Sequence, residues 1–427
     1  MRRRGVYLVT LALVFSLLVL GVVGCAQPTP AGETKPAPTA EAKPAPTEAK
    51  PTAAATKPAP VATKPAAEAK PAAGGEVKLG ALIPYTGIGA MTAKDIEQGI
   101  KFAIERAGGQ TAGKKIALVT EDETDDPSIA VAKARKLVEQ DKVVGVIGPL
   151  LAHNAAAVAA FLAPSGIPNI NFGNIDGTES KDSFYAVGTG KGNAYPVGVY
   201  AYDELGAKTA AVLAMDYSMG EQSAVGFIDG FTSKGGKIVS RQKIPMGAAD
   251  MAPFIEGIGK ADLVAALLVN PSDMAFVRQY TQAGLKMPVV FISNSPQEEP
   301  VLAQMGDAVL GMYGASLYSP LIDTPFNKQF VQEYTAKYGG VPGGTTQAGY
   351  LATAMYLEAI KSTGGDTDKA KITQALLGIK NLENPGGLAS VSPGRIVIQD
   401  LHIFKAIKIG SRYAWSVVKT IPQVQPR

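Results

Sequence analysis

The chain has 427 residues, of which 46% are hydrophobic, so it can bury the cores of two or three domains and is not disordered as a whole. Its single cysteine excludes an internal disulfide, and its two histidines leave few groups for catalysis or metal binding. Removing the three arginines near the amino terminus from the 41 basic residues leaves 38 against 37 acidic ones. The remaining charge is close to neutral and does not indicate nucleic-acid binding.

The amino terminus predicts a lipoprotein signal peptide over residues 1–24. Arg2 to Arg4 form a basic segment, residues 6–23 are almost entirely apolar, and small residues precede Cys25. The peptidase that processes bacterial lipoproteins cleaves before such a cysteine, so we expect an acyl anchor on Cys25 at the extracytoplasmic face of a membrane. The alternative is an uncleaved membrane helix, whose roughly 18 apolar residues lie at the lower limit for crossing a bilayer.

Residues 25–75 predict a disordered tether. The segment is built from Ala, Pro, Thr, Lys and Glu and has no aromatic residue, so burial cannot offset the entropy of ordering it. Proline-rich chain is extended at about 3.1 Å per residue, which gives the tether a reach on the order of 100 Å or more. The tripeptide Lys-Pro-Ala recurs in it at Lys35, Lys43, Lys57, Lys64 and Lys70.

From residue 76 onward, short apolar runs alternate with helical periodicity. In the first predicted helix, Ile96, Ile100, Ala103 and Ile104 fall on one face. In the second, Asp126 is the expected N-cap before Pro127. The strands expected in this half are 77–83, 115–121 and 143–147, and a third helix is expected from about residue 154.

The same alternation restarts near residue 208 and predicts an α/β fold with two doubly wound parallel sheets. The helices expected in the second half are 221–234, one that carries Phe276, Val277 and Tyr280, and the longer 327–338, 346–362 and 369–379. The expected strands are 209–214, 237–243, 262–269, 288–293, 395–398 and 403–409.

No sequence motif indicates catalysis or a cofactor: the chain has no H-E-x-x-H, G-x-S-x-G, P-loop or paired-cysteine metal signature. The glycine pairs that begin at Gly108, Gly235 and Gly339 each end a predicted helix, where glycine supplies a left-handed cap. The acidic run 121–126 lacks the central glycine and terminal glutamate of an EF-hand, so we interpret it as a solvated loop that ends in a helix cap. We therefore expect neither an enzyme nor a metal site.

Ligands of open α/β sheets bind beyond the carboxyl ends of the strands, where helix N-termini present free N–H groups. In this chain, those ends are expected at residues 85–92, 148–154, 171–176, 215–220, 270–273 and 293–297. Each polar residue there can equally serve as a helix cap or a turn residue.

Several segments resemble the leucine/isoleucine/valine-binding type of extracytoplasmic solute-binding proteins, which serve ABC importers. They are Val77 to Gly87, Asp125-Asp126-Pro127 with the following helix, and Val144 to Pro149; in the second half they include Asp262-Leu263-Val264 and Ala283-Gly284-Leu285. The resemblance covers residues 77 to about 415. It implies a type I periplasmic-binding fold, in which two lobes close on a small solute by hinge motion.

The resemblance also implies where the lobes lie. Lobe 1 is expected to comprise residues 76–190 and 319–388, and lobe 2 residues 191–318 and 389–427. Three crossovers are expected between them, near 188–193, 314–319 and 388–392.

By carry-over from the family and from the strand ends, we expect ligand contacts from Tyr85, Thr92, Leu151, Ala152, His153, Asn154, Asn174, Asp176, Tyr217, Met219, Asn270 and Ser295. Members of the family that bind amino acids hold the carboxylate with a serine hydroxyl where this chain has Leu151-Ala152. The glutamate that pairs with the ammonium falls near Ser295. A buried ammonium without a carboxylate costs several kcal/mol, so the expected ligand is a small polar organic solute, or a carboxylic acid held by backbone N–H groups.

The sequence thus predicts a lipid-anchored, monomeric substrate-binding protein that delivers a small solute to the permease and ATPase subunits of an ABC importer. No cofactor or nucleic acid is expected. Three alternatives remain open: a binder of branched-chain amino acids, a ligand-sensing ectodomain that reports to a membrane receptor, and a secreted hydrolase on the same scaffold.

Overall fold

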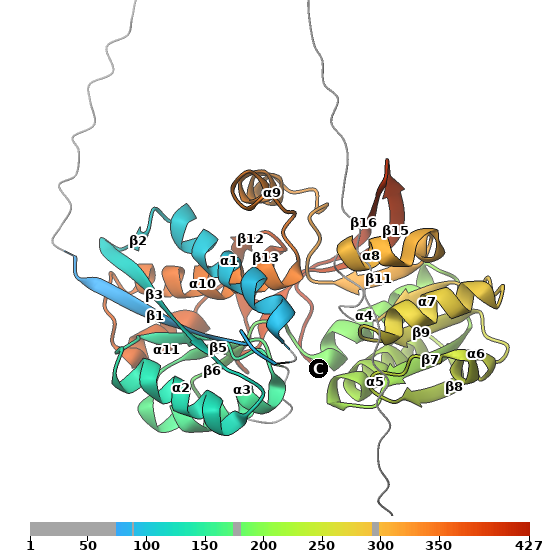
Figure 1. Ribbon diagram of the computed structural model, residues 1–427, viewed down its shortest axis with the longest axis horizontal. Helices are drawn as coiled ribbons and strands as arrows, with labels where there is room; N and C mark the ends of the chain where they lie inside the picture. The colour runs from blue at the N-terminus through green and yellow to red at the C-terminus, as the bar shows by residue number, and fades with distance from the viewer. Residues whose placement is uncertain (1–73, 88, 174–180, 293–298) are drawn as a thin grey trace, which may run out of the picture. The chain divides into compact units, whose positions relative to one another are not determined.

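A computed structural model describes residues 74–87, 89–173, 181–292 and 299–427 (Figure 1). Two large sheets with separate hydrophobic cores and a small three-stranded sheet form this part of the chain. The predicted α/β fold with two lobes is therefore confirmed. Among the described residues, no helix combines the length and apolar character needed to span a bilayer. Cys25 and the predicted tether up to residue 73 lie outside these residues.

The first lobe contains a six-stranded sheet in the order β2-β3-β1-β4-β5-β6. Its strands run parallel except β2, which pairs antiparallel with β3. Helices α1, α10 and α11 cover one face, and α2 and α3 cover the other (Figure 1). The strands are β1 (Glu76–Ile83), β2 (Gln110–Thr111), β3 (Lys114–Asp122), β4 (Gly145–Ile147), β5 (Asn169–Asn171) and β6 (Ser183–Tyr185). The helices are α1 (Ala90–Arg106), α2 (Pro127–Glu139), α3 (Ala152–Leu162), α10 (Gly344–Ser362) and α11 (Lys369–Leu377).

Local sequence signals explain these helices. The apolar stripe predicted for α1 is buried, with Ile96 and Ile100 at most 1% exposed. Asp126 caps α2 as expected, because its Oδ1 accepts a hydrogen bond from the backbone N–H of Ser128 (2.7 Å). Helix α9 (Pro325–Tyr338) packs on α1 and α10 through an aromatic cluster in which the rings of Phe330 and Tyr350 lie 5.0 Å apart.

The second lobe contains a seven-stranded sheet in the order β16-β15-β11-β10-β9-β7-β8. Strands β7 to β11 run parallel, but β15 and β16 form an antiparallel hairpin at the edge. We predicted a parallel sheet, but this sheet is mixed. A two-residue turn joins β15 to β16, and so short a connection allows only antiparallel pairing. Its strands are β7 (Thr209–Met215), β8 (Lys237–Ile244), β9 (Leu263–Leu267), β10 (Val289–Phe291), β11 (Tyr313–Ser316), β15 (Leu401–Ile409) and β16 (Arg412–Ile421). Its helices are α4 (Gly190–Asp203), α5 (Ser218–Ser233), α6 (Ala252–Glu256), α7 (Ser272–Gln282) and α8 (Glu299–Met305).

The chain passes between the two sheets three times, and the third crossover differs from the prediction. The first lies between β6 and α4, and the second follows β11, both within or next to the expected ranges. The expected range 388–392 lies instead in β13, part of a three-stranded sheet whose Ala389 and Val391 belong to the core of the first lobe. The chain leaves for the second sheet only at Asp400. The three strands are β12 (Leu382–Asn384), β13 (Gly387–Val391) and β14 (Val397–Gln399).

Tyr356 of α10 links this helix to the centre of the first sheet. Its ring is fully buried, and its hydroxyl lies 2.7 Å from the carbonyl oxygen of Pro168 and 3.1 Å from that of Val146. We expect Tyr356→Phe to lower the free energy of unfolding by about 1–3 kcal/mol, because two buried carbonyl groups each lose the hydrogen bond from the hydroxyl. The urea-denaturation midpoint measures this loss. Tyr413→Phe, which removes an exposed hydroxyl bonded to Asp307 (2.7 Å), should change stability by less than about 0.5 kcal/mol; equal losses would contradict the prediction.

Candidate functional site

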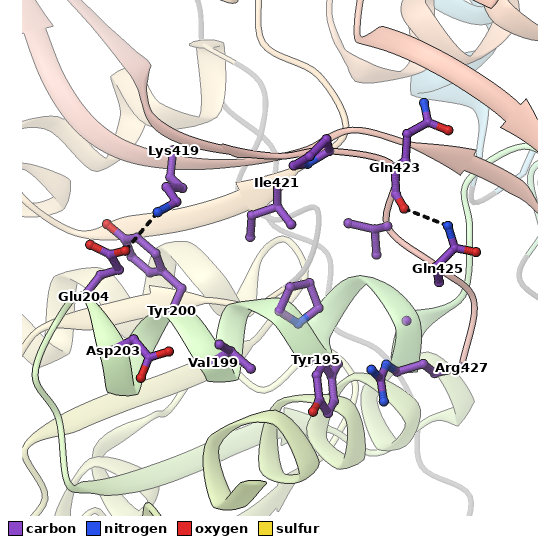
Figure 2. Close-up of a pocket in the computed structure, with 14 residues that line it drawn as sticks. Tyr195, Val199, Tyr200, Asp203, Glu204, Lys419, Ile421, Gln423, Gln425 and Arg427 are labelled. Atoms are coloured by element: carbon purple, nitrogen blue, oxygen red, sulfur yellow. Dashed lines mark hydrogen bonds and ion pairs between the residues drawn. The ribbon is translucent and has the colours of Figure 1, made fainter. Parts of the chain in front are cut away.

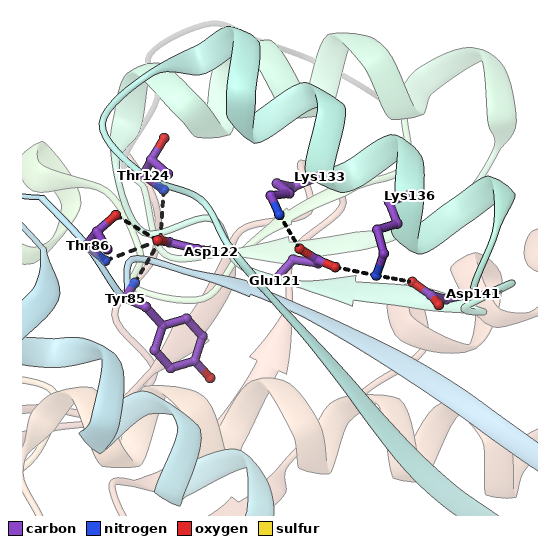
Figure 3. A network of polar contacts seen from close by, with 8 residues as sticks. All are labelled: Tyr85, Thr86, Glu121, Asp122, Thr124, Lys133, Lys136 and Asp141. Atoms are coloured by element: carbon purple, nitrogen blue, oxygen red, sulfur yellow. Dashed lines mark hydrogen bonds and ion pairs between the residues drawn. The ribbon is translucent and has the colours of Figure 1, made fainter.

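The carboxyl ends of β1 and β3 are tied together by the side chain of Asp122 (Figure 3). Its Oδ1 accepts hydrogen bonds from the backbone N–H groups of Tyr85 (2.9 Å), Thr86 (3.3 Å) and Thr124 (3.0 Å). Its Oδ2 accepts one from the Thr86 hydroxyl (2.7 Å). Partial burial acts in the opposite direction, but these four bonds hold the pKa of Asp122 below its ordinary value. The turn after β1 is thus held by an ionised carboxylate.

Glu121, the preceding residue of β3, points away from this turn (Figure 3). Its carboxylate pairs with Lys133 (2.8 Å) and Lys136 of α2. Neighbouring residues of a strand face opposite sides of the sheet, so Glu121 and Asp122 belong to different contacts.

Glu123 lies beneath the N-terminus of α3 and is wholly inaccessible to solvent. Its Oε1 accepts the N–H of Leu150 (2.8 Å), and its Oε2 accepts the N–H of Leu151 (3.3 Å) and the Asn154 amide (3.0 Å). Burial raises the pKa of Glu123 to about 7, although these three bonds favour the ionised form. The run 121–126 is therefore not the solvated loop that we predicted, because the first two residues belong to β3 and Glu123 is buried; only the cap at Asp126 is confirmed.

Helix α3 begins at the carboxyl end of β4 without a side-chain cap. The N–H groups of its first residues, Ala152, His153 and Asn154, have no carbonyl one turn earlier in the helix to bond. Ala152 is exposed, and Leu151 at the N-cap is half-buried. This end of α3 carries partial positive charge and free donors, which is the arrangement that binds an anion.

The polar side chains predicted on α3 differ in their surroundings. His153 is exposed and donates from Nε2 to the carbonyl oxygen of Asp125 (3.1 Å). Asn154 is fully buried and donates to the carbonyl oxygen of Thr124 (2.8 Å) as well as to Glu123. Its amide therefore holds the loop between β3 and α2 against α3.

Tyr85 and Thr92 lie near the same edge of the sheet. Burial raises the pKa of Tyr85 to about 12, with a smaller contribution from the charge of Glu97. Thr92 is half-buried and donates its hydroxyl to the carbonyl oxygen of Gly89 (2.8 Å). Its hydroxyl thus bonds within the first turn of α1.

In the second lobe, three predicted residues follow the strands β7 and β9. Tyr217 is the N-cap residue of α5, and its side chain remains 37% exposed. Met219 is half-buried, and its sulfur would lie 2.7 Å from a Cβ placed on Gly190, the first residue of α4. Asn270 is exposed at the end of β9. The predicted contacts Asn174, Asp176 and Ser295 lie outside the described residues.

Sequence reasoning did not identify Asp122 and Glu123 as site residues. A signal was present, since both acidic residues lie at the carboxyl end of a strand that pairs with the central β1. Among the residues that the structure describes, no group of three or more His, Cys, Asp or Glu side chains could hold a metal ion.

A separate pocket of about 460 Å³ lies between α4 and the segment that follows β16 (Figure 2). Tyr195, Val199 and Ile421 provide apolar walls, and the ion pair of Lys419 with Glu204 (2.8 Å) lies at one end. None of the predicted ligand contacts lines this pocket. It is distinct from the strand ends described above.

Comparisons with known proteins support the two-lobe fold described above. Residues 76–410 match the model of the family described as periplasmic binding protein. A Leu/Ile/Val-binding protein homolog 6 from Brucella suis is 25% identical over 344 residues, which are 78% of this chain and 88% of that protein. An ABC transporter substrate-binding protein from Sphaerobacter thermophilus has 28% identity and a TM-score of 0.77, with 82% of this chain and 98% of that one covered. With the same coverage, the solute-binding protein of an ABC transporter from Rhodopseudomonas palustris, in complex with 3,4-dihydroxybenzoic acid, has 29% identity and a TM-score of 0.74.

Proposed function

Because the chain belongs to the periplasmic binding protein family, whose members bind small ligands for ABC transporters, we propose that it captures a small organic carboxylate and delivers it to the permease of an ABC importer. Family membership implies an extracytoplasmic location. Among the residues we expect to contribute, Leu151, Ala152 and His153 present the N-terminus of α3, and Tyr217, Met219 and Asn270 contribute from the second lobe.

The uncapped N-terminus of α3 is the observation that carries this proposal. It offers backbone N–H groups and the positive end of a helix dipole beside an exposed alanine. A carboxylate can accept two or three such hydrogen bonds without any side-chain hydroxyl. The bound dihydroxybenzoic acid of the Rhodopseudomonas protein is a ligand of this chemical class.

The described acidic residues of this edge favour a ligand without an ammonium group. Asp122 accepts four hydrogen bonds from the turn and its own loop, and Glu123 accepts three, from Leu150 and Leu151 before α3 and from Asn154. Both carboxylates are therefore engaged. A buried ammonium that lacks a carboxylate partner is strongly disfavoured.

A branched-chain amino acid is the second candidate, favoured by the similarity to the Leu/Ile/Val-binding protein homolog. A ligand-sensing role beside a membrane receptor is a further alternative. It would use the same strand-end site and differ only in the partner protein.

A panel of ligands tests the proposal. We expect thermal-shift and calorimetric titrations to detect binding of benzoate, 4-hydroxybenzoate or 3,4-dihydroxybenzoate, with stabilisation that follows RT ln(1 + [L]/Kd). Leucine, valine and benzamide, which lacks the carboxylate, serve as comparisons. Binding of leucine that is tighter than that of every aromatic acid would favour the second candidate, and binding of benzamide as tight as that of benzoate would refute recognition of a carboxylate.

Attachment to the membrane is tested at Cys25. We expect Cys25→Ser to prevent acylation and to move the protein from the membrane fraction to the soluble extracellular or periplasmic fraction, because one or more acyl chains are its proposed anchor. Immunoblots of the two fractions measure the change. Alanine in place of Ser16, within the apolar segment, is the control and should leave the protein with the membrane. Retention of Cys25→Ser in the membrane fraction would favour the uncleaved helix.

A further inference from the structure

The buried carboxylate of Glu123 shares the N-terminus of α3 with the proposed solute. It accepts the N–H groups of Leu150 and Leu151, and its neighbour in space, Asn154, belongs to the first turn of the helix. The next N–H groups along the chain, from Ala152 onward, are those left for a ligand. The donors at this helix end therefore bind the carboxyl group of Glu123 permanently and would bind the carboxylate of the solute when it is present.

We propose that Glu123 is a positioning residue that couples solute capture to protonation: it orients the N-terminus of α3, and in its ionised form it weakens the binding of an anion there. This inference rests on the proposed function. An ionised Glu123 partly neutralises the positive charge at the N-terminus of α3, and it repels a second carboxylate close by. A protonated Glu123 does neither, so the carboxylate of the ligand interacts with the undiminished helix dipole.

The other charged groups near Glu123 do not replace it in this role. Asp122, the adjacent residue, is held ionised by four hydrogen bonds and faces the turn after β1. Asp125 and Asp126 are exposed in the loop before α2, and His153 of α3 is exposed with its Nε2 on the Asp125 carbonyl. Among the described residues that pack on Glu123, no cation pairs with its carboxylate. Its protonation is thus governed by burial, by the donors of Leu150, Leu151 and Asn154, and by the negative charge of Asp122, which also raises the pKa of Glu123.

The direction of the coupling follows from the pKa of about 7 that burial gives Glu123. Below this pH the group is mostly protonated, and the anion binds without repulsion. A bound anion raises the pKa further, because it disfavours a second negative charge. Binding then takes up a proton near neutral pH, and affinity falls as the pH rises through 7 and above.

Calorimetric titration of the full-length protein, either acylated or as Cys25→Ser, tests this coupling. The probes are benzoate and leucine, because the carboxylate of each stays ionised from pH 5.5 to 8.5. We expect about tenfold weaker binding at pH 8.5 than at pH 5.5, and proton uptake when titrations at pH 7 are repeated in buffers of different ionisation enthalpy. Glu123→Gln should bind with the same affinity at both pH values and take up no proton. Glu121→Gln, which changes the acid two residues earlier that pairs with lysines of α2, should keep the wild-type pH dependence.

The possible outcomes are distinct. Binding of either probe to the wild type with a flat pH profile and no proton uptake would overturn the role of Glu123 and leave the proposed function intact. If neither probe binds at any pH, carboxylate capture fails and this inference fails with it. If Glu123→Gln does not fold, carbon-13 NMR titration of the wild-type Glu123 carboxyl decides: its pKa must rise when the probe is added, and an unchanged pKa refutes the coupling.

Discussion

Replacement of Ala152 by aspartate is expected to weaken binding of a carboxylate by at least about a hundredfold, or about 2.7 kcal/mol. Ala152 is exposed in the first turn of α3, beside the N–H groups proposed to hold the ligand. Two negative charges about 4 Å apart repel by roughly 4 kcal/mol at an effective dielectric constant of about 20. Calorimetric titration with benzoate measures the loss.

The same substitution should leave the fold intact. An acidic residue in the first turn of a helix stabilises it by about 0.3–1 kcal/mol, since it interacts with the helix dipole. The urea-denaturation midpoint should therefore stay the same or rise while affinity falls. Ala152→Asn is the control, because asparagine has the size of aspartate but no charge. It should lose less than about tenfold in affinity if charge is the cause. Undiminished binding to Ala152→Asp would place the ligand carboxylate elsewhere.

Replacement of Gly230 by alanine is expected to destabilise the second lobe by about 2–3 kcal/mol. Gly230 lies on α5 where this helix packs against α4, and a Cβ there would overlap the carbonyl oxygen of Tyr195. Gly226 makes the same kind of approach to the carbonyl oxygen of Lys191. Both obstacles are backbone atoms, which cannot move aside unless the two helices separate.

The sign of the change in the free energy of unfolding shows whether packing or helix propensity dominates at Gly230. Alanine is favoured over glycine by about 1 kcal/mol within an isolated helix, so propensity alone predicts stabilisation. Urea denaturation monitored by circular dichroism measures which effect dominates. Gly340→Ala is the control, because a Cβ there meets no atom within 4 Å and the residue does not have a positive φ. A stabilised Gly230→Ala would show that the helices are not in close contact at this point.

Local patterns predicted most helices and most of the longer strands. The apolar stripe of α1, the Asp126 cap of α2 and the pattern Phe276, Val277 and Tyr280 in α7 all depend on residues within one or two turns of each other. The strand expected at 395–398 corresponds to β14, but β12 and β13 of the same small sheet and β16 of the second sheet were missed. Their pairing depends on strands that lie elsewhere in the chain or across a hairpin, and short runs such as β12 carry little periodicity of their own.

The third crossover was predicted about ten residues too early for the same reason. Small residues at 388–392 can absorb backbone rotation in a hinge, but they can equally form a strand when a partner is present. In the structure, β13 pairs with both β12 and β14, and its apolar side chains join the first core. Only the position of those partners distinguishes the two possibilities.

By itself, the sequence determined the alternation of strands and helices and the two-lobe class, because periodicity and the order of elements along the chain depend on local spacing. The strand ends as the place where a ligand binds stay a prediction. Tertiary structure alone decided the roles within the acidic run. Glu121 pairs with lysines of α2, Asp122 holds the turn after β1, and Glu123 is buried under α3. These three consecutive carboxyl groups have the same chemistry, and only their different neighbours, supplied by other parts of the chain, give them different pKa values and different structural roles.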